Sequence, residues 1–351
     1  MLSADVEVDR RDFAVRAALS VAAGERVALF GPSGAGKTTV LESIAGLVLP
    51  RRGLVELGGR VLTSAGGPRP VAVPPYQRRI GLLRQDPGLF PHLPVRANLL
   101  YARSSSGAEV EAIARQLGID GLLSAMPARL SGGQQHRVAL GRLLLAHCDA
   151  LLLDEPFASL DAALRRALTA LVKDLSSERT VPSVLVTHQL PDAQAFADRL
   201  FVMDQGSVLQ EGAPDEVVLR PASRRVAELV GYLGFVPVAP PGASGARGTS
   251  GADGSDDDPA GTVVAGGVVA GVHPDRVVPG ADPSRGLVVT GTVEAARPSG
   301  ASWEADLRAG DAAFTCRLPS CPESAQVSVT LLAPPYFAPD GSRISNSHAL
   351  T

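Results

Sequence analysis

Lysine is scarce in this chain of 351 residues: it occurs only at Lys37 and Lys173, so nearly all of the positive charge is arginine. The net charge of -3 gives no basic excess of the kind that binds a phosphate backbone. This charge balance argues against a protein that binds DNA or RNA. Because arginine is the usual cation of the chain, a lysine inside a motif is informative.

Cysteine and long apolar runs are also few. The three cysteines, Cys148, Cys316 and Cys321, form no disulfide framework, so we expect free thiols in a reducing compartment. Cys316 and Cys321 lack the second pair of ligands that a zinc site needs. No run approaches the roughly 18 consecutive apolar residues of a membrane-spanning helix, and the N-terminus lacks the apolar core of a signal peptide. We therefore expect a cytosolic protein that needs a partner for any role at a membrane.

Apolar segments that fit strands alternate with segments that fit helices over residues 1–236. Such βα alternation predicts an α/β domain with a largely parallel sheet. The segment 53–62 resembles a hairpin that turns at Gly58 and Gly59, and 86–126 is mostly helical with interrupting prolines. Further strands are expected at 26–30, 151–153 and 184–187, and further helices at 38–48, 134–146 and 162–175.

The composition changes sharply at residue 237. Residues 237–262 contain almost no large apolar side chains, so this segment cannot offset its ordering entropy and is expected to be a flexible linker. Residues 263–340 carry short valine- and leucine-rich runs between glycine and proline turns, which predicts a small all-β domain with an OB-like fold and a regulatory role. Residues 341–351 are expected to form a disordered tail.

A glycine-rich turn is the first motif that carries chemistry. Residues 31–38 read GPSGAGKT and fit the pattern G-x-x-x-x-G-K-[ST] in full. Glycines let successive backbone amides turn toward phosphate oxygens, and the following helix adds its positive N-terminal end. Lys37 supplies a point charge for the β- and γ-phosphates, and the Thr38 hydroxyl suits Mg²⁺. The predicted nucleotide-binding residues are Gly31, Pro32, Ser33, Gly34, Ala35, Gly36, Lys37, Thr38 and Thr39.

The run LLLDE at 151–155 is the second motif. A buried strand that ends in Asp154 delivers a carboxylate to the metal beside the phosphates. Glu155 follows directly and can orient or deprotonate an attacking water molecule. Two acidic residues at the end of a strand are common, but beside a phosphate-binding loop they predict a site that hydrolyses ATP with Mg²⁺.

The run LSGGQ at 130–134 distinguishes between classes of nucleotide-hydrolysing protein. Ser131, Gly132, Gly133 and Gln134 lie at the start of a predicted helix, where backbone amides and the helix dipole form a second anion site. One chain needs only one such site for each triphosphate. The motif therefore predicts a head-to-tail pair in which this loop covers the γ-phosphate held by the other subunit.

With these motifs, residues from about Val6 to Gly234 resemble the ATP-binding subunits of ABC transporters. The resemblance implies a P-loop ABC cassette with a mixed sheet, an antiparallel β subdomain and a helical subdomain. It also implies that Gln85, in LLRQD, contacts the metal and senses the γ-phosphate, and that His188, after VLVT, holds the γ-phosphate and water. The loop that crosses the dimer interface corresponds to Ser159, Leu160 and Asp161.

Two positions depart from the pattern of the family. The family often has an aromatic residue before the P-loop that stacks on adenine, and only Phe13 is a candidate; Phe13 also fits a core position of a strand. His136 stands where lysine or arginine is usual after the LSGGQ motif, and a solvated helix face accounts for it.

Two further segments resemble importers within the family. The region 86–99 matches the groove that receives the coupling helix of a permease, with Phe90, Pro91 and His92 as candidate contacts; alternatively, Leu89 and Phe90 pack the helical subdomain. The run AGVHPDRVV at 270–278 is similar to the start of the small β domain of many importer ATPases. Together these segments look most like molybdate importer subunits, although sulfate, iron(III), polyamine and sugar importers share much of the pattern.

The resemblance therefore implies an ATPase that drives uptake through separate transmembrane permease subunits, at the cytoplasmic face of the plasma membrane. A second ATPase subunit, in a homodimer, and a periplasmic or lipoprotein solute-binding protein are the other implied partners. Two alternatives stay open. One is a soluble ABC protein acting on ribosomes or DNA, although the single cassette argues against it. The other is a C-terminal domain that senses an oxyanion.

Overall fold

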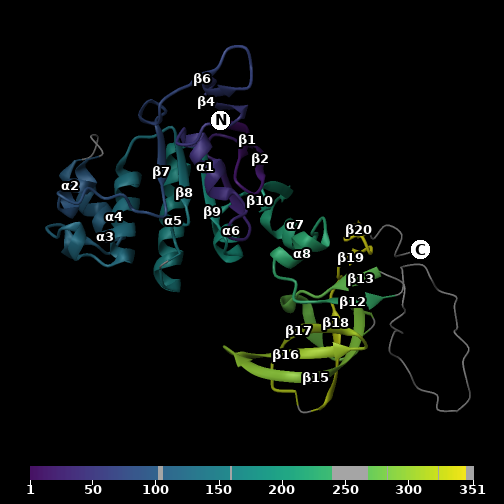
Figure 1. Ribbon diagram of the computed structural model, residues 1–351. Coiled ribbons are helices and arrows are strands. Elements are labelled where there is room, and N and C mark those ends of the chain that lie inside the picture. Colours follow the sequence, from purple (N-terminus) through teal and green to yellow (C-terminus); the bar gives the residue numbers. More distant parts are fainter. Residues whose placement is uncertain (102–105, 159, 239–267, 283, 323, 345–351) are drawn as a thin grey trace, which may run out of the picture. The chain divides into compact units, whose positions relative to one another are not determined.

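The computed structural model describes residues 1–101, 106–158, 160–238, 268–282, 284–322 and 324–344 (Figure 1). The chain divides into two compact units, Met1–Asp215 and Glu216–Thr351. None of the helices within the described residues has the length and hydropathy that crossing a lipid bilayer requires.

A mixed sheet of eleven strands forms the N-terminal unit, in the order β6-β5-β4-β1-β2-β11-β10-β3-β9-β8-β7. The strands β10, β3, β9, β8 and β7 run parallel to one another, whereas β6, β5, β4, β1 and β2 pair antiparallel with one another. The strand β11 joins the two halves, pairing antiparallel with β10 and parallel with β2. Our expectation of a largely parallel sheet thus describes only one half of the sheet. The bounds are β1 Leu2–Asp9, β2 Ala14–Val21, β3 Arg26–Phe30, β4 Arg52–Leu57, β5 Arg60–Ala65, β6 Val71–Ala72, β7 Ile80–Leu83, β8 Ala150–Asp154, β9 Ser183–Thr187, β10 Arg199–Asp204 and β11 Ser207–Gly212.

The three central strands β3, β8 and β9 are buried on both faces, which explains their continuous apolar sequences. In β1 and β2, by contrast, buried and more exposed residues alternate, as expected where only one face packs on the core. The helix α1 (Lys37–Ala45) contributes Val40, Leu41 and Ile44 to the same core as Leu29 and Leu152. This packing fixes the start of α1 beside the C-terminal ends of the central strands.

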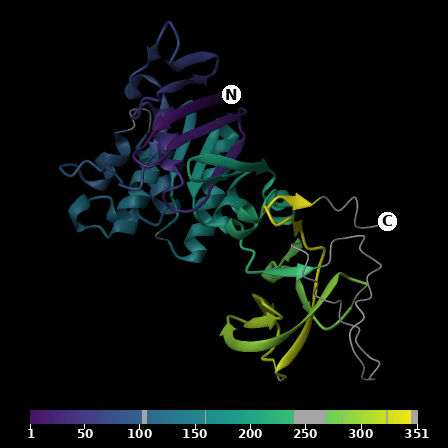
Figure 2. The ribbon, with the colours of Figure 1, turned by 45° about the vertical axis from the view of Figure 1, so that its right-hand side comes forward.

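The helices α2 (Val95–Leu100), α3 (Gly107–Gln116) and α4 (Gly132–Leu145) pack on one another and form the expected helical subdomain. They lie together beside β7 (Figures 1 and 2). Short 3₁₀ turns, Asp120–Leu122 and Pro127–Arg129, complete the region that we expected to be mostly helical. The remaining helices of the unit are α5 (Ala162–Arg179) and α6 (Leu190–Phe196), and a 3₁₀ turn spans Pro75–Gln77.

Helix ends differ from our expectations by a few residues. The helix expected at 38–48 ends at Ala45, because Gly46 adopts a left-handed conformation (φ 81°) and its amide donates to the carbonyl groups of Glu42 and Ser43. The helix expected at 134–146 begins two residues earlier, at Gly132, because Ser131 caps it.

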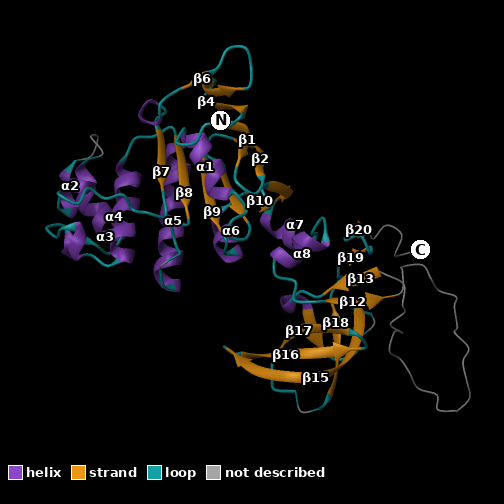
Figure 3. Cartoon of the chain, viewed as in Figure 1, coloured by secondary structure: helices purple, strands orange, loops and turns teal. Residues whose placement is uncertain are grey.

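Helices α7 (Pro214–Leu219), at the unit boundary, and α8 (Arg224–Leu229) precede two antiparallel sheets in the C-terminal unit (Figure 3). One sheet has the order β12-β13-β19-β20 and the other β14-β18-β15-β16-β17. A hydrophobic core of the C-terminal unit includes Val272, Leu307, Phe314, Cys316 and Val329. The bounds are β12 Phe235–Val238, β13 Val268–Gly271, β14 Val277–Pro279, β15 Leu287–Ser299, β16 Ser302–Ala309, β17 Ala312–Leu318, β18 Gln326–Leu331, β19 Tyr336–Phe337 and β20 Arg343–Ile344, with a 3₁₀ turn at Pro274–Arg276.

The expected all-β character of the C-terminal region is confirmed, while its OB-like fold and regulatory role stay predictions. The first two residues of the predicted linker, Pro237 and Val238, belong to β12, which pairs with β13. The rest of that linker lies outside the described residues. So does the predicted tail from residue 345 onward, whereas Arg343 and Ile344 form β20.

Candidate active site

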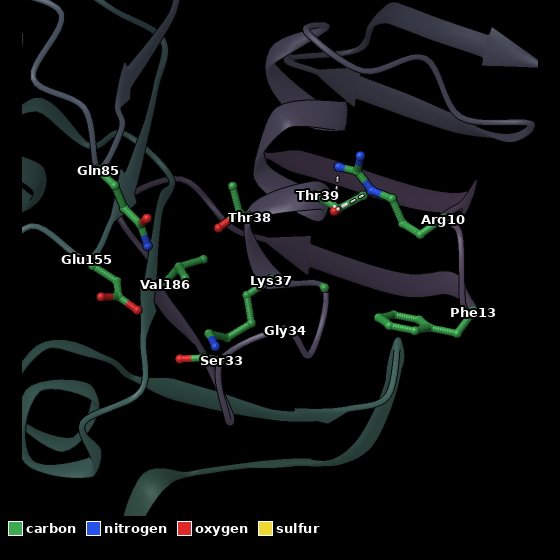
Figure 4. A pocket seen from close by; sticks show the side chains of 11 residues that line it. Arg10, Phe13, Ser33, Gly34, Lys37, Thr38, Thr39, Gln85, Glu155 and Val186 are labelled. Atoms are coloured by element: carbon green, nitrogen blue, oxygen red, sulfur yellow. Dashed lines mark hydrogen bonds between the residues drawn. The ribbon is translucent and has the colours of Figure 1, made fainter.

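A cavity of about 460 Å³ opens at the N-terminal end of α1, a size that suits a small-molecule ligand (Figure 4). It combines the phosphate-binding turn with residues from the ends of other elements. Nine of its lining residues were predicted site residues, and Arg10 and Val186 were not. The lining residues are Arg10, Phe13, Ser33, Gly34, Gly36, Lys37, Thr38, Thr39, Gln85, Glu155 and Val186.

Close packing explains why the turn needs glycine at two positions. A Cβ atom on Gly31 would lie 2.0 Å from the carbonyl oxygen of Met203, at the end of β10. A Cβ on Gly36, whose φ is 99°, would lie 2.7 Å from a methyl group of Val15 in β2. The turn therefore packs tightly against the sheet, and its amides can line a ligand without intervening side chains.

The side chain of Lys37 is nearly fully buried in the turn. Its Nζ donates hydrogen bonds of 2.8 Å to the carbonyl oxygens of Gly31 and Pro32. Burial lowers the pKa of this amine, while the nearby carboxylates of Glu155 and Asp154 oppose that shift. The ammonium group is thus held in the mouth of the turn, where it can neutralise a phosphate group.

Thr38 and Asp154, two of the three predicted metal ligands, are hydrogen-bonded to each other. The Thr38 hydroxyl donates a 2.9 Å hydrogen bond to Oδ2 of Asp154, and Asp154 is only 2% exposed. Burial raises the pKa of this carboxyl group, and its Oδ1 atom has no hydrogen-bond partner among the described residues. A buried carboxylate oxygen without a partner, a hydroxyl group and the Gln85 side chain in the same cavity fit the oxygen ligands that Mg²⁺ prefers.

Glu155 and His188 form a hydrogen-bonded pair. Oε1 of Glu155 lies 2.8 Å from Nδ1 of His188. Glu155 has a φ of 49°, a conformation that costs a non-glycine residue about 1–3 kcal/mol, and its amide donates to the carbonyl oxygen of Val186. This backbone places the carboxylate at the edge of the cavity, and His188 fixes its orientation.

The LSGGQ motif lies at the exposed start of α4 and does not line this cavity. The hydroxyl oxygen of Ser131 accepts a hydrogen bond from the amide of Gln134, and Oε1 of Gln134 accepts one from the amide of Ser131. This reciprocal capping box orders the helix start. Within one chain, therefore, the motif and the phosphate-binding turn are not brought together.

The start of α5 holds Asp161. Its Oδ1 atom accepts hydrogen bonds of 3.0 Å from the amides of Ala163 and Leu164, and these bonds lower the pKa of Asp161. Asp161 thus caps α5, a role that the sequence comparison did not suggest. Ser159, from the same expected interface loop, lies outside the described residues.

Phe13 and His136, the two departures from the family pattern, lie in different surroundings. Phe13 lines the cavity and also packs against the core, so both interpretations remain in place. His136 is only partly exposed; burial lowers its pKa, and its Nε2 atom has no hydrogen-bond partner among the described residues. A solvated helix face, which we expected, does not describe this environment.

A second cavity, of about 390 Å³, lies beside Phe90. The Phe90 ring stacks on Tyr101 with centroids 4.2 Å apart, and the Arg142 guanidinium lies 5.1 Å from its centroid. Asn98, fully buried, accepts a hydrogen bond from the Phe90 amide and donates to the carbonyl oxygens of Phe90 and Leu93, which anchors the loop. No sequence pattern singles out Asn98, because its hydrogen-bond partners are set by the fold of the loop.

Residues 15–158, from the second strand to the loop beyond the carboxylate pair, match the family model described as ABC transporter. This part of the N-terminal unit is similar to the ATP-binding domains of ABC transporters. The eleven-stranded mixed sheet and the helical subdomain agree with the ABC fold of the solved structures that this chain resembles. A structure described as the ATP-binding subunit of an ABC transporter is 29% identical, has a TM-score of 0.54, and covers 66% of this chain and 95% of its own.

A second similar structure is the dimeric ATP-binding cassette MJ0796 in a post-hydrolysis state with ADP and Pi. It is 27% identical with a TM-score of 0.51 and covers 61% of this chain and 99% of its own. The curated relatives that this chain matches are named as import ATP-binding proteins, and the chain spans about three fifths of their length.

Those relatives are named for different cargoes. The iron import protein FbpC of Pseudomonas fluorescens is 45% identical over 218 residues, covering 61% of this chain and 60% of that protein. The molybdenum import protein ModC of Mesorhizobium japonicum is 42% identical over 237 residues, covering 64% and 63%. The sulfate/thiosulfate import protein CysA 2 of Chromobacterium violaceum is 41% identical over 222 residues, covering 62% and 58%. Because the iron, molybdenum and sulfate proteins are almost equally similar to this chain, the comparison does not determine the cargo.

Proposed function

We propose that this chain is the ATP-hydrolysing subunit of an ABC importer. ATP binds with its phosphates in the turn at 31–39, where Lys37 and the amides at the start of α1 neutralise them. Thr38, Gln85 and Asp154 hold Mg²⁺, which neutralises charge on the phosphates when it is bound. The observation that carries the proposal is the pair Glu155–His188, 2.8 Å apart, next to a buried carboxylate with a free oxygen.

In the hydrolytic step, Glu155 orients a water molecule and accepts a proton from it as the water oxygen bonds to the γ-phosphorus. The bond between the γ-phosphorus and the bridging oxygen breaks, and ADP and inorganic phosphate leave. His188 fixes the carboxylate of Glu155 through its Nδ1 atom and faces the γ-phosphate. The backbone conformation of Glu155 supports this role, since strained residues of this kind cluster at functional sites.

The complete site requires a second copy of the chain. Gly132 and Gly133 present backbone amides, and Ser131 presents a hydroxyl group, at the start of a helix of 14 residues and away from the cavity of their own chain. We propose that they cover the γ-phosphate in the cavity of the partner subunit, with Leu160 and Asp161 at the interface. The dimeric state of a similar cassette with ADP and Pi supports this arrangement.

Transport requires transmembrane permease subunits and a periplasmic or lipoprotein solute-binding protein, with this chain peripheral at the cytoplasmic face of the membrane. We propose that the cavity beside Phe90, with Pro91 and His92 nearby, receives a permease helix, because an aromatic side chain and Arg142 line it. The names of the importer relatives support these partners.

For the cargo we propose molybdate or a related oxyanion. The run AGVHPDRVV and the match of 237 residues with a molybdenum import protein support this choice, while the 45% identity to an iron import protein favours iron(III) as the alternative. Uptake by cells that lack this chain and are complemented with it decides between them. Restored molybdenum accumulation supports the proposal, whereas restored iron accumulation alone contradicts it.

The substitution Glu155→Gln tests the hydrolytic step. The amide cannot act as a base, so we expect ATP hydrolysis to fall at least about 100-fold, while ATP binding persists and a dimer accumulates. Phosphate release, ATP titration and gel filtration measure these effects. Glu111→Gln, the same change on an exposed residue of α3, is the control. Hydrolysis at the wild-type rate in Glu155→Gln would contradict the role of Glu155.

A further inference from the structure

The loop between β1 and β2 brings an arginine to the nucleotide cavity. Arg10 follows the last residue of β1, and its amide donates to the carbonyl oxygen of Phe13 across the loop. Its side chain lines the cavity and reaches α1, where Nε and Nη2 donate to the Thr39 hydroxyl oxygen at 3.0 and 2.7 Å. The sequence did not point to this contact, because it joins residues 29 positions apart.

The positive charge of Arg10 is only partly compensated. The nearest carboxylate, that of Glu42, lies 3.6 Å from its Nη2 atom, which is too far for a hydrogen bond. Glu42 also forms a closer ion pair, at 3.2 Å, with Arg84. With 42% of its side chain exposed, the Arg10 guanidinium keeps donors and charge for a ligand in the cavity.

The position of Arg10 in the cavity indicates which part of a bound nucleotide it would contact. In the close-up view, Glu155 and Gln85 lie at one end of the cavity, Lys37 and Thr38 lie in the middle, and Arg10, Thr39 and Phe13 lie at the other end (Figure 4). In the proposed function the γ-phosphate faces Glu155, so the nucleoside lies toward Phe13. The phosphate between these ends and nearest to Thr39, the third residue of α1, is the α-phosphate.

We propose that Arg10 binds the α-phosphate and thus serves as a second cationic ligand of the nucleotide beside Lys37. Its guanidinium is already held at the start of α1, where the amides of Lys37, Thr38 and Thr39 precede the first helical hydrogen bond, from Val40 to Gly36. An arginine can keep one pair of donors on Thr39 while another donor reaches a phosphate oxygen. This contact is independent of the base. The inference rests on the proposed function, since it assigns a further contact in the same site.

Arg10→Ala and its neighbour Arg11→Ala form a matched pair. Both remove one positive charge from the same loop, but Arg11 is exposed and does not line the cavity. Calorimetric titration of the full chain with Mg²⁺–ADP and with Mg²⁺–tripolyphosphate measures binding. We expect Arg10→Ala to weaken both by about tenfold, Arg10→Lys to weaken them less, and Arg11→Ala to leave them unchanged.

Several outcomes separate this inference from simpler ones. Equal affinities of Arg10→Ala and Arg11→Ala would overturn it, as would weaker binding of ADP with unchanged binding of tripolyphosphate, which indicates a contact with ribose or base. Arg10→Gln keeps a donor for Thr39 without the charge, and it serves if Arg10→Ala does not fold. If Arg10 contacts a phosphate directly, the ADP affinity of Arg10→Gln should depend less on salt concentration than that of the wild type. An unchanged salt dependence would indicate a structural role for Arg10 and would overturn the proposal. If the wild type itself fails to bind ADP, the proposed function fails instead.

Discussion

At the scale of one residue, the buried carboxylate of Asp154 destabilises the folded protein. This carboxylate is buried and accepts a hydrogen bond from the Thr38 hydroxyl, while Oδ1 has no hydrogen-bond partner among the described residues. Burial raises its pKa, so the charged form opposes folding at neutral pH. Because the folded pKa lies above the ordinary value of 3.8, this penalty fades as the pH falls through the folded pKa.

We predict that Asp154→Asn stabilises the nucleotide-free protein and removes its response to Mg²⁺. Loss of the buried charge should raise the free energy of unfolding by about 1 kcal/mol, or the melting temperature by about 2–4 °C. The wild type should melt higher with Mg²⁺–ATP than with ATP alone, and this difference should shrink as the pH falls, because protons compete with Mg²⁺ for the carboxylate. Differential scanning fluorimetry measures both effects.

Asp149→Asn is the control for that change, since Asp149 lies just before the other end of β8 and pairs with Arg79 at the surface. We expect its melting temperature to stay near that of the wild type, because exposed ion pairs contribute little. A melting temperature of Asp154→Asn below that of Asp149→Asn would contradict the account of a costly buried charge.

At the scale of single elements, the start of α4 combines a structural and a functional role in Ser131. Its hydroxyl caps the helix, and in the proposed dimer it faces the γ-phosphate of the partner subunit. Alanine would remove both roles, whereas aspartate keeps the cap and adds a negative charge. We predict that Ser131→Ala lowers the free energy of unfolding by about 1 kcal/mol, while Ser131→Asp leaves it near the wild-type value.

Hydrolysis distinguishes the two roles of Ser131. If the serine only caps α4, Ser131→Asp should hydrolyse ATP at the wild-type rate. If it faces the γ-phosphate, Ser131→Asp should lose ATP-dependent dimerisation and hydrolysis, because like charges repel across the interface. Thermal unfolding and phosphate release measured on the same preparations provide the comparison.

Elements whose residues carry their own local pattern were predictable from the sequence. The strands β3, β8 and β9 are short apolar runs, and Gly58–Gly59 forms the turn of the hairpin between β4 and β5. Features that depend on distant pairing were not. The antiparallel half of the sheet follows from β1 pairing with both β2 and β4, and only this pairing carries Arg10 to Thr39. Local patterns thus located the turn and the acidic pair, while tertiary structure supplied the contacts of Arg10 and Asn98. The cap role of Asp161 is itself local, since its partners are the amides of Ala163 and Leu164, but we did not predict it.

At the scale of the whole molecule, the described chain contains both halves of the proposed nucleotide site but does not bring them together. Lys37 lies in the cavity, and the LSGGQ loop is exposed elsewhere on the same unit. A two-fold symmetric pair of chains uses each half twice, so it contains two sites that each combine the cavity of one chain with the loop of the other. A variant defective in the cavity and a variant defective in the loop therefore damage different halves of a site.

Mixing two inactive variants tests this sharing. Lys37→Ala removes the charge that binds the phosphates, and Ser131→Asp repels them, so we expect each variant alone to hydrolyse ATP poorly. In a dimer of one chain of each kind, one site has both defects and the other has none. If the sites act independently and chains pair at random, an equal mixture should recover up to about a quarter of wild-type hydrolysis.

A Lys37→Ala,Ser131→Asp double variant mixed with Lys37→Ala is the control and should recover none, because no pairing of these chains contains an intact cavity. Absence of recovery in the first mixture would contradict independent sites shared between subunits, since the intact site of the mixed dimer would then have no activity.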